Sequence, residues 1–206
     1  QEILTVANAV LGFGQASLAK YLMISAHEDK PELDIHDIPQ YLAHILERIN
    51  WERDLHFQTR TTIDTLDYSG SGLNQGSKVV MAAAGKPIRK LGTEIPEFLS
   101  LGQGIAKGFK NPKWVMPGVI AVESPVYKQQ EEAEKQARIF CETMEPFAEK
   151  LHEFPLIVLV DDSSFVAAKL KNFLWVTFTR SNPAHDIHGV NSFVDHKHWG
   201  CKGPLV

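Results

Sequence analysis

Histidine and cysteine side chains gather near the end of the sequence, and their chemistry is that of metal ligands. Imidazole nitrogens and a thiolate sulfur are ligands that zinc prefers in proteins. The segment nevertheless lacks the C-x-x-C and H-E-x-x-H spacings of familiar zinc sites and contains a single cysteine. A zinc-binding domain therefore stays a minor alternative, whose candidate ligands, within 17 residues, are His185, His188, His196, His198 and Cys201.

Two neighbouring carboxylates and three glycine-rich segments are the other places where the residue types could do chemistry. Asp161 and Asp162 could act as a general acid and base. A carboxylate pair that follows the apolar run FPLIVLV is, however, more typical of a solvated turn. The segments at 12–17, 72–78 and 102–108 lack the preceding strand or the glycine spacing that a phosphate-binding loop requires.

A spaced set of polar residues occurs twice in the sequence. RINWERDLHF begins at residue 48 and RSNPAHDIHG at residue 180, so that Arg, Asn, Asp and His recur at a constant offset of 132. Average residue usage predicts about 0.5 identities over about nine positions, whereas the two segments share these four residue types. We interpret them as two copies of one structural unit in which polar residues shape a turn. The predicted turn residues are Arg48, Asn50, Asp54, Arg180, Asn182 and Asp186.

The repeat also predicts a helix that local propensity opposes. FLWVTFTR (173–180) is rich in β-branched and aromatic residues, which favour strands. Its counterpart by the offset, YLAHILER (41–48), has the pattern of a helix. We therefore predict a helix over 165–180, ended by Pro183. Arg48 and Arg180 should then end two equivalent helices, each followed by an equivalent strand.

The remaining elements follow from hydrophobic periodicity. Residues 85–117 are rich in Gly, Pro and Lys, and irregular structure with short helices is expected there. The alternation of strands and helices predicts an α/β fold, with layered helices on a largely parallel or mixed sheet and two related half-units around 18–60 and 152–192. The predicted helices cover 3–11, 37–49 (capped by Asp37) and 128–152 (interrupted by Pro146), and the predicted strands cover 21–25, 54–64, 117–124 and 154–160.

The composition excludes several classes of protein. Of the 206 residues, 44% are hydrophobic and 22% are charged, as in an ordinary globular domain. A net charge of −4 and a pI of about 6.1 give no electrostatic basis for binding nucleic acid or an anionic membrane. No apolar run approaches the roughly 20 residues that span a bilayer. The two cysteines lie far apart and do not indicate a disulfide framework. We expect a cytoplasmic protein without a transmembrane segment.

Several segments resemble those of the UbiD-family decarboxylases, and they occur in the family's order. LWVTFTRSNPAHDIHGV (174–190) is similar to a Trp-containing helix that runs into an Arg-x-(Asp/Asn)-Pro-Ala-(Arg/His)-Asp motif. GQASLAKYLMI (14–24) resembles a helix leading into a strand, and TIDTLDYSGSGLNQGSK (62–78) resembles the Asp-x-Leu-Asp and Gly-Ser-Lys segments. The resemblance covers 10–80 and 155–206.

The resemblance implies a non-oxidative carboxy-lyase of aromatic or α,β-unsaturated acids in ubiquinone or menaquinone biosynthesis. Such enzymes use prenylated FMN and a divalent metal. In the family, the essential arginine, the two glutamates and the flavin-phosphate and metal ligands lie in an upstream domain, for which this sequence has no matching segment. No catalytic, cofactor-binding or metal residue is therefore assigned here, and no cofactor is expected in this chain. Asp67 and Lys78 are predicted to line the cleft towards the upstream domain.

We therefore expect residues 1–206 to be the C-terminal domain of a longer enzyme, an expectation to which the start in a helical pattern without Met also points. The domain would consist of a first half-unit (1–84), an expanded connecting segment with a long helix (85–150) and a second half-unit (151–206). Its partners would be the upstream catalytic domain of the same chain and further copies in a homo-oligomer. By itself it should be inactive. A non-enzymatic oligomerisation module is the alternative interpretation.

Overall fold

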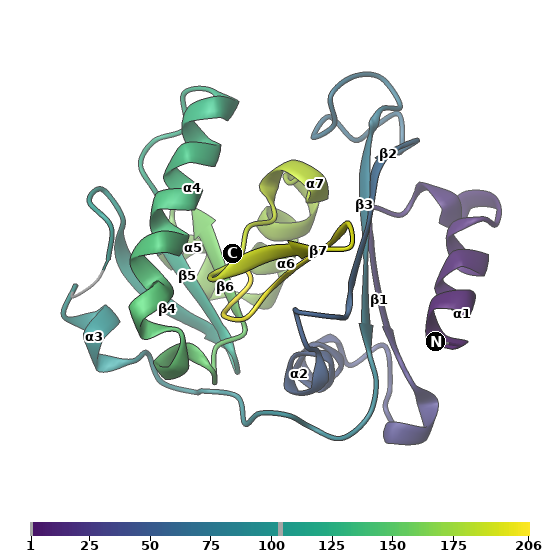
Figure 1. The fold of residues 1–206 in the computed structure, drawn as a ribbon, viewed down its shortest axis with the longest axis horizontal. Coiled ribbons are helices and arrows are strands. Elements are labelled where there is room, and N and C mark those ends of the chain that lie inside the picture. Colours follow the sequence, from purple (N-terminus) through teal and green to yellow (C-terminus); the bar gives the residue numbers. More distant parts are fainter. Residues whose placement is uncertain (1, 103–104) are drawn as a thin grey trace.

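Two small mixed sheets form the framework of the protein, which a computed structural model describes over residues 2–102 and 105–206. In the first sheet the order is β1-β3-β2, with β1 parallel and β2 antiparallel to the central strand. In the second sheet the order is β4-β5-β6, with β4 antiparallel and β6 parallel to the central strand. The mixed α/β fold expected from the sequence is confirmed (Figure 1). The strands are β1 (Tyr21–Ser25), β2 (Leu55–Thr61), β3 (Gly76–Ala83), β4 (Lys110–Met116), β5 (Val119–Glu123) and β6 (Leu156–Val160).

Helices cover both outer faces of this framework and the space between the sheets. Helix α1 packs on the outer face of the first sheet, and α3 and α4 pack on the outer face of the second. Helices α2 and α6 contribute to the core shared by the two inner faces. The helices of four or more residues are α1 (Glu2–Leu11), α2 (Ile38–Arg48), α3 (Glu97–Ser100), α4 (Gln130–Met144), α5 (Ser163–Ala168), α6 (Leu170–Thr179) and α7 (Pro183–Asp186), with 3-10 turns at 14–18, 27–29, 145–147 and 149–151.

The alternation of side chains along the central strands explains these layers. Successive residues of a strand point to opposite faces, so an uninterrupted apolar strand must be covered on both sides. In β3, Val79 and Met81 enter the shared core while Val80 and Ala82 pack towards α1. In β5, Val119 faces the shared core and Ile120 packs towards α4.

Local signals place the helix ends where the sequence predicts them. Asp37 caps α2, because its side chain accepts a hydrogen bond from the backbone N–H of Gln40 at 3.2 Å. Helix α4 ends at Met144, and Pro146 lies in the 3-10 turn that follows. A proline removes a backbone donor and clashes with the preceding turn, which ends the regular helix.

One strand lies where irregular structure is expected. The short helix α3 confirms part of the prediction for 85–117, but β4 shows that the rest is wrong. Strand β4 is polar and lies at the sheet edge, so it has no clear alternation, and its pairing with β5 stabilises it. The signal that could have revealed this pairing is Pro117-Gly118, a sequence typical of a type II turn, in which Gly118 has φ +78°.

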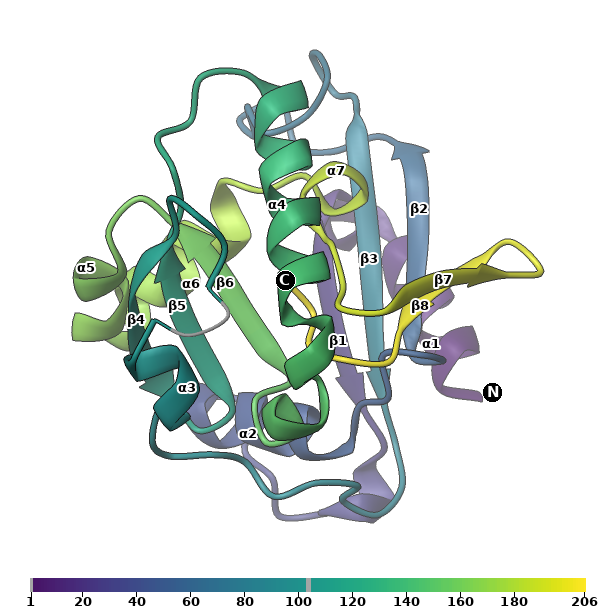
Figure 2. The ribbon, with the colours of Figure 1, turned by 60° about the vertical axis from the view of Figure 1, so that its left-hand side comes forward.

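The helix predicted from the repeat is confirmed, and the strand predicted to follow it is wrong. Helices α5 and α6 occupy the predicted range, with a break at Lys169. After α7 no strand begins until β7 (Ser192–Asp195), which pairs with β8 (His198–Cys201) in a hairpin that projects from the body (Figure 2). The backbone of residues 188–190 instead bonds to the chain end, and His188 and Val206 exchange hydrogen bonds of 2.8 and 2.9 Å.

Arg89, in the loop after β3, holds the C-terminal end of α2. Its Nη1 donates to the carbonyl oxygens of Leu46 and Ile49 at 2.6 and 2.7 Å. A cation at a helix C-terminus interacts favourably with the helix dipole, and hydrogen bonds from charged groups are stronger than neutral ones.

We expect Arg89→Met to lower the free energy of unfolding by about 1.5–3 kcal/mol in urea titrations. The exposed neighbour Lys90 provides the control, since Lys90→Met should cost under about 0.5 kcal/mol. Equal losses would contradict a capping role.

Candidate functional site

An apolar cavity of about 700 Å³ lies between the two sheets. Its walls come from the inner faces of both sheets and from α2 and α6, so residues far apart in sequence meet there. A volume of this size is within the range of about 300–1,000 Å³ found for sites that bind small molecules. The apolar lining includes Met23, Met81, Phe109, Val160 and Phe173.

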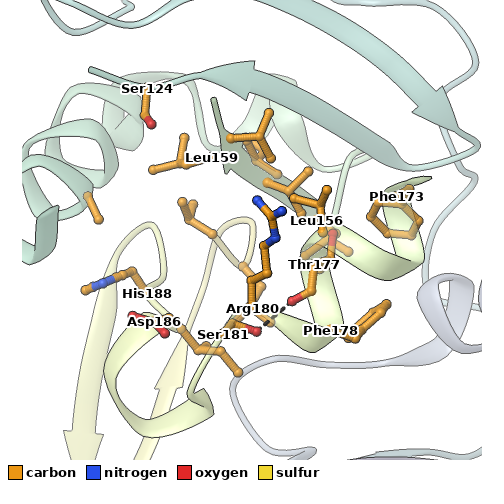
Figure 3. Close-up of a pocket in the computed structure, with 18 of the residues that line it drawn as sticks. Ser124, Leu156, Leu159, Phe173, Thr177, Phe178, Arg180, Ser181, Asp186 and His188 are labelled. Atoms are coloured by element: carbon orange, nitrogen blue, oxygen red, sulfur yellow. Dashed lines mark hydrogen bonds between the residues drawn. The ribbon is translucent and has the colours of Figure 1, made fainter. Parts of the chain in front are cut away.

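The mouth of the cavity is polar and is framed by two loops. Tyr68 in one loop and Tyr127 in the other are 89% and 59% exposed, so both rings are accessible to a ligand. Arg180, at the end of α6, extends towards Leu156 and Leu159 of the cavity wall (Figure 3). The polar mouth and apolar interior together form a site suited to an amphipathic molecule.

A hydrogen-bonded pair fixes the wall next to Arg180. The hydroxyl of Ser181 donates to the carbonyl oxygen of Thr177 at 2.6 Å, and the hydroxyl of Tyr21 lies 2.5 Å from that of Ser181. Because Ser181 uses its own proton in the first bond, Tyr21 donates in the second. Burial raises the pKa of Tyr21 above its ordinary value, so the phenol remains protonated. The pair therefore positions the end of α6 against β1.

The carboxylates near the mouth have hydrogen-bond partners of their own. Asp186 accepts from the backbone N–H of Asn182 at 2.6 Å and from the side chain of Gln130 at 3.2 Å. In Glu134, Oε1 lies 3.6 Å from Nδ1 of His185 and Oε2 lies 3.7 Å from Nη2 of Arg138. The pKa of Glu134 is lowered, first by its hydrogen bond from Gln130 and then by His185 and Arg138, so it is ionised at neutral pH.

The six predicted turn residues form two turns with the same hydrogen bonds. In the first turn, the backbone N–H of Asn50 donates to the Asp54 carboxylate at 2.9 Å and Asp54 N–H donates back to Asn50 O at 2.8 Å. In the second turn, Asn182 and Asp186 make the same two bonds at 2.6 and 2.9 Å. Arg48 is the last residue of α2, and Arg180 directly follows α6.

Each turn is anchored on the opposite half of the protein. The indole N–H of Trp51 in the first turn donates to Pro155 O, just before β6, at 2.8 Å. The hydroxyl of Ser77 in β3 donates to the side-chain oxygen of Asn182 and accepts from the Ala184 N–H at 2.8 Å. The repeated turns therefore join the two sheets that enclose the cavity.

Asp67 and Lys78, predicted to line a cleft, belong to different environments. Asp67 pairs with Lys20 at 2.8 Å, and the two side chains are only 17% and 8% exposed. Lys78 is buried in β3, where its ammonium group lies 3.3 Å from the Thr61 hydroxyl, and burial lowers its pKa. Neither residue is among those that line the cavity. That they face an upstream domain stays a prediction.

The histidines and cysteine of the metal alternative are dispersed. His185 lies beside Glu134, His196 is exposed in the turn of the β7-β8 hairpin, and His198 lies next to His56 with ring centres 5.8 Å apart. Burial lowers the pKa of His188 and raises that of the Cys201 thiol to about 12. Over 2–102 and 105–206, no three His, Cys, Asp or Glu side chains are arranged to hold a metal ion.

The other predicted candidates have structural surroundings. Asp162 caps α5 by accepting from the Phe165 N–H at 2.8 Å, while Asp161 contributes to the cavity lining. The segment 72–78 leads into strand β3, and the segment 102–108 lies partly outside the described residues. Sequence reasoning missed the mouth residues Tyr68, Tyr127, Gln130 and Glu134, because their meeting depends on how two distant loops pack.

The residues around the cavity do not fit a flavin cofactor. A flavin phosphate is usually held by several convergent N–H donors or cations, often at the N-terminus of a helix. The mouth instead combines one arginine with the carboxylates of Glu134 and Asp186. No chemical step through a flavin is therefore assigned to this chain.

Among the described helices, none is long and apolar enough to cross a membrane.

Comparisons with known proteins agree with the resemblance noted in the sequence. Residues 1–83 match the profile of the UbiD_C family, described as the 3-octaprenyl-4-hydroxybenzoate carboxy-lyase C-terminal domain. An uncharacterized protein of Chlamydia trachomatis is 36% identical over 203 residues, covering 96% of this chain and 31% of the relative. A Chlamydia pneumoniae protein named as a 4-hydroxybenzoate decarboxylase subunit is 33% identical over 198 residues, covering 96% of this chain and 30% of the relative. The chain therefore spans about a third of the length of these relatives.

Proposed function

We propose that this chain is the C-terminal part of a non-oxidative decarboxylase of aromatic or unsaturated acids, because its residues 1–83 match the family described as the 3-octaprenyl-4-hydroxybenzoate carboxy-lyase C-terminal domain. The family match is the observation that carries this proposal. The similarity to the Chlamydia pneumoniae protein named as a decarboxylase subunit extends it over 96% of the chain. A place in ubiquinone or menaquinone biosynthesis is part of the same proposal, since the family description names a polyprenyl-4-hydroxybenzoate.

In this proposal the chain supplies cleft closure and oligomer contacts, and the catalytic groups lie in a further domain upstream. Prenylated FMN and a divalent metal would be bound there, and the flavin would supply an electrophilic centre that stabilises the substrate as carbon dioxide leaves. The residues of the present chain would bind the substrate and orient it.

The proposal is tested with the longer protein and with this chain alone. The longer protein, loaded with prenylated FMN and Mn²⁺, should release carbon dioxide from 4-hydroxybenzoate or a prenylated derivative. The 206-residue chain under the same conditions should release none. Release by the chain alone would contradict the division of roles, and a loaded longer protein that is inactive on a panel of aromatic and unsaturated acids would contradict the carboxy-lyase function.

The exposed aromatic pair of α5 and α6 favours the second candidate, a non-enzymatic oligomerisation module. Phe165 and Trp175 are both substantially exposed, with ring centres 6.4 Å apart. Exposed clustered aromatic residues are typical of contact surfaces between proteins. This candidate would replace the first if the loaded longer protein is inactive and Trp175→Ala dissociates its oligomer.

A further inference from the structure

The β7-β8 hairpin is fixed to the body of the protein along β8. The backbone N–H of Cys201 donates to Trp51 O at 3.3 Å, and Nε2 of His198 donates to Glu52 O at 3.0 Å, since a carbonyl oxygen can only accept. Gly200 permits this close approach, because a Cβ there would lie 2.9 Å from Trp51 O. The projecting hairpin is therefore held in a defined place beside β2 (Figure 2).

The two residues at the tip of the hairpin are ones that the turn disfavours. His196 and Lys197 connect the paired residues Asp195 and His198, and their φ angles are +45° and +66°. A two-residue turn with two positive φ angles is usually formed by Asn-Gly, because a side chain in this region of φ is strained. Strain kept at two successive positions points to a use for the side chains that they carry.

A second pocket, of about 480 Å³, lies between the hairpin, β2 and α7. Four of its lining residues carry rings, two from β2 and two from β8. Phe57 and Trp199 meet edge to face with ring centres 5.7 Å apart, and the ring centres of His56 and His198 are 5.8 Å apart. A flat aromatic body suits this lining, because it can stack on such rings. The rest of the apolar lining is Leu55, Pro183, Ala184 and Ile187.

The same pocket presents several hydrogen-bond donors. Lys197 contributes an ammonium group, and over residues 2–102 and 105–206 it forms no salt bridge. Thr59 contributes a hydroxyl. Burial and then the charge of His198 lower the pKa of His56, so its imidazole is neutral at neutral pH and keeps one N–H donor.

The charges around the second pocket favour an anion. Among the described residues, those that line it include no Asp or Glu. Asp54, just before β2, is paired with Arg53 at 2.7 Å, and Asp195, just before the turn, lies 3.6 Å from Nε2 of His196. The cavity between the sheets, by contrast, has three carboxylates in its lining. A phosphate group suits the second pocket because its three terminal oxygens can each accept from one of the donors.

We propose that the second pocket binds a phosphate monoester of an aromatic compound, with the phosphate at Lys197, Thr59 and His56 and the ring against Phe57 and Trp199. The strained turn would then serve to place the Lys197 ammonium group beside the phosphate. This pocket is separate from the cavity between the sheets, and its ligand does not depend on the carboxy-lyase function proposed above.

Isothermal titration calorimetry of the purified chain with 2-naphthyl phosphate tests the site. Two counterparts each lack one half of the probe, since 2-naphthol has no phosphate and inorganic phosphate has no ring. The probe should bind about tenfold or more tightly than either counterpart, because each loses one set of contacts. Equal affinity for the probe and either counterpart would overturn the proposal, as would failure of the probe to bind the folded chain at about 1 mM.

Single variants with matched controls locate the bound probe. Lys197→Gln should weaken binding about tenfold or more, because a charge-assisted hydrogen bond is lost. Lys202→Gln, at an exposed lysine just after β8, and Arg180→Gln, in the cavity between the sheets, should bind within about twofold of the parent. A cooperative urea transition shows that each variant is folded. Unchanged affinity in folded Lys197→Gln, or a tenfold loss in Arg180→Gln, would overturn the assignment.

The hairpin turn gives a second and independent readout. His196→Asn combined with Lys197→Gly introduces the pair that such turns prefer, so the double variant should unfold at a higher urea concentration than the parent. It should nevertheless bind 2-naphthyl phosphate about tenfold or more weakly, a loss that a purely structural turn would not produce. Parental affinity in the double variant would overturn the proposal, and a lower urea midpoint would contradict the strain from which it is argued.

Discussion

Replacing Asp67 with asparagine is expected to lower the free energy of unfolding by about 3–5 kcal/mol, the usual cost of breaking a buried ion pair by removing one partner. The Lys20 side chain is 8% exposed, and besides Asp67 at 2.8 Å the contacts of its ammonium group are the Ser69 hydroxyl at 2.8 Å and Thr179 O at 3.4 Å. Without the carboxylate, a buried cation would keep only neutral partners. Urea titration monitored by circular dichroism measures the change.

The matched control for Asp67 lies three residues earlier in the same loop. Asp64 accepts from the Leu66 N–H at 2.8 Å, as Asp67 accepts from the Ser69 N–H at 2.9 Å, but the described residues give Asp64 no ion pair. Asp64→Asn should therefore cost under about 1 kcal/mol. If both substitutions cost the same, the loop hydrogen bonds rather than the ion pair stabilise this region.

The ion pair also has a defined pH dependence. Burial by itself raises the pKa of Asp67, but the hydrogen bonds from Lys20 and Ser69 and the charge of Lys20 lower it below its ordinary value. A carboxyl whose pKa is lower in the folded state stabilises the fold above its unfolded pKa, and this contribution disappears as the pH falls through the folded pKa. The difference in stability between parent and Asp67→Asn should therefore be constant near neutral pH and shrink below about pH 4.

Truncation of Trp51 is the second change with a large expected effect, a loss of about 3–5 kcal/mol for Trp51→Ala. The side chain is 3% exposed in the shared core, and its indole N–H donates to Pro155 O in the other half of the protein. Trp51→Phe separates the two contributions. It retains much of the apolar volume and removes one of the two donors to the Pro155 carbonyl, which keeps the Leu205 N–H at 2.9 Å, so the expected loss is about 0.5–1.5 kcal/mol.

Trp114 is the control for the loss of an indole ring. It lies on the edge strand β4 and is 39% exposed, so Trp114→Ala should cost under about 1.5 kcal/mol. Chemical denaturation of the three variants under one condition gives the comparison. A Trp51→Phe variant as stable as the parent would show that the bond between the halves contributes nothing.

Much of the fold could be predicted because its signals are local. Asp37 and Pro146 mark helix ends through hydrogen bonding and sterics within one turn of chain, and YLMIS and FPLIVLV have the length and composition of buried strands. The repeat correctly overrode the strand propensity of 173–179, because a turn with the same residues must follow the same kind of element. The UbiD-family resemblance, which rests on the segments 14–24, 62–78 and 174–190, is confirmed by the family match over residues 1–83.

Other features were not predicted, because they depend on strand pairing and not on the composition of one segment alone. Strand β4 is polar and exists because β5 accepts it at the sheet edge. At the offset of 132, the residues after the second turn correspond to β2, yet their backbone bonds to the chain end. The structural repeat therefore ends at the turn. The pairing of β4 is signalled locally only by the turn at Pro117-Gly118, and the pairing with the chain end has no local signal.

The sequence by itself determined most helices and strands, the two equivalent turns and the resemblance to the UbiD_C family, since periodicity, capping and turn chemistry act over a few residues. Only the tertiary structure decided what the two arginines do. Arg48 and Arg180 occupy the same place in the repeated turn, but packing buries the first against Glu47 and leaves the second at the mouth of a cavity. That cavity exists because two sheets, each anchored on the other half's turn, hold their apolar faces apart around α6.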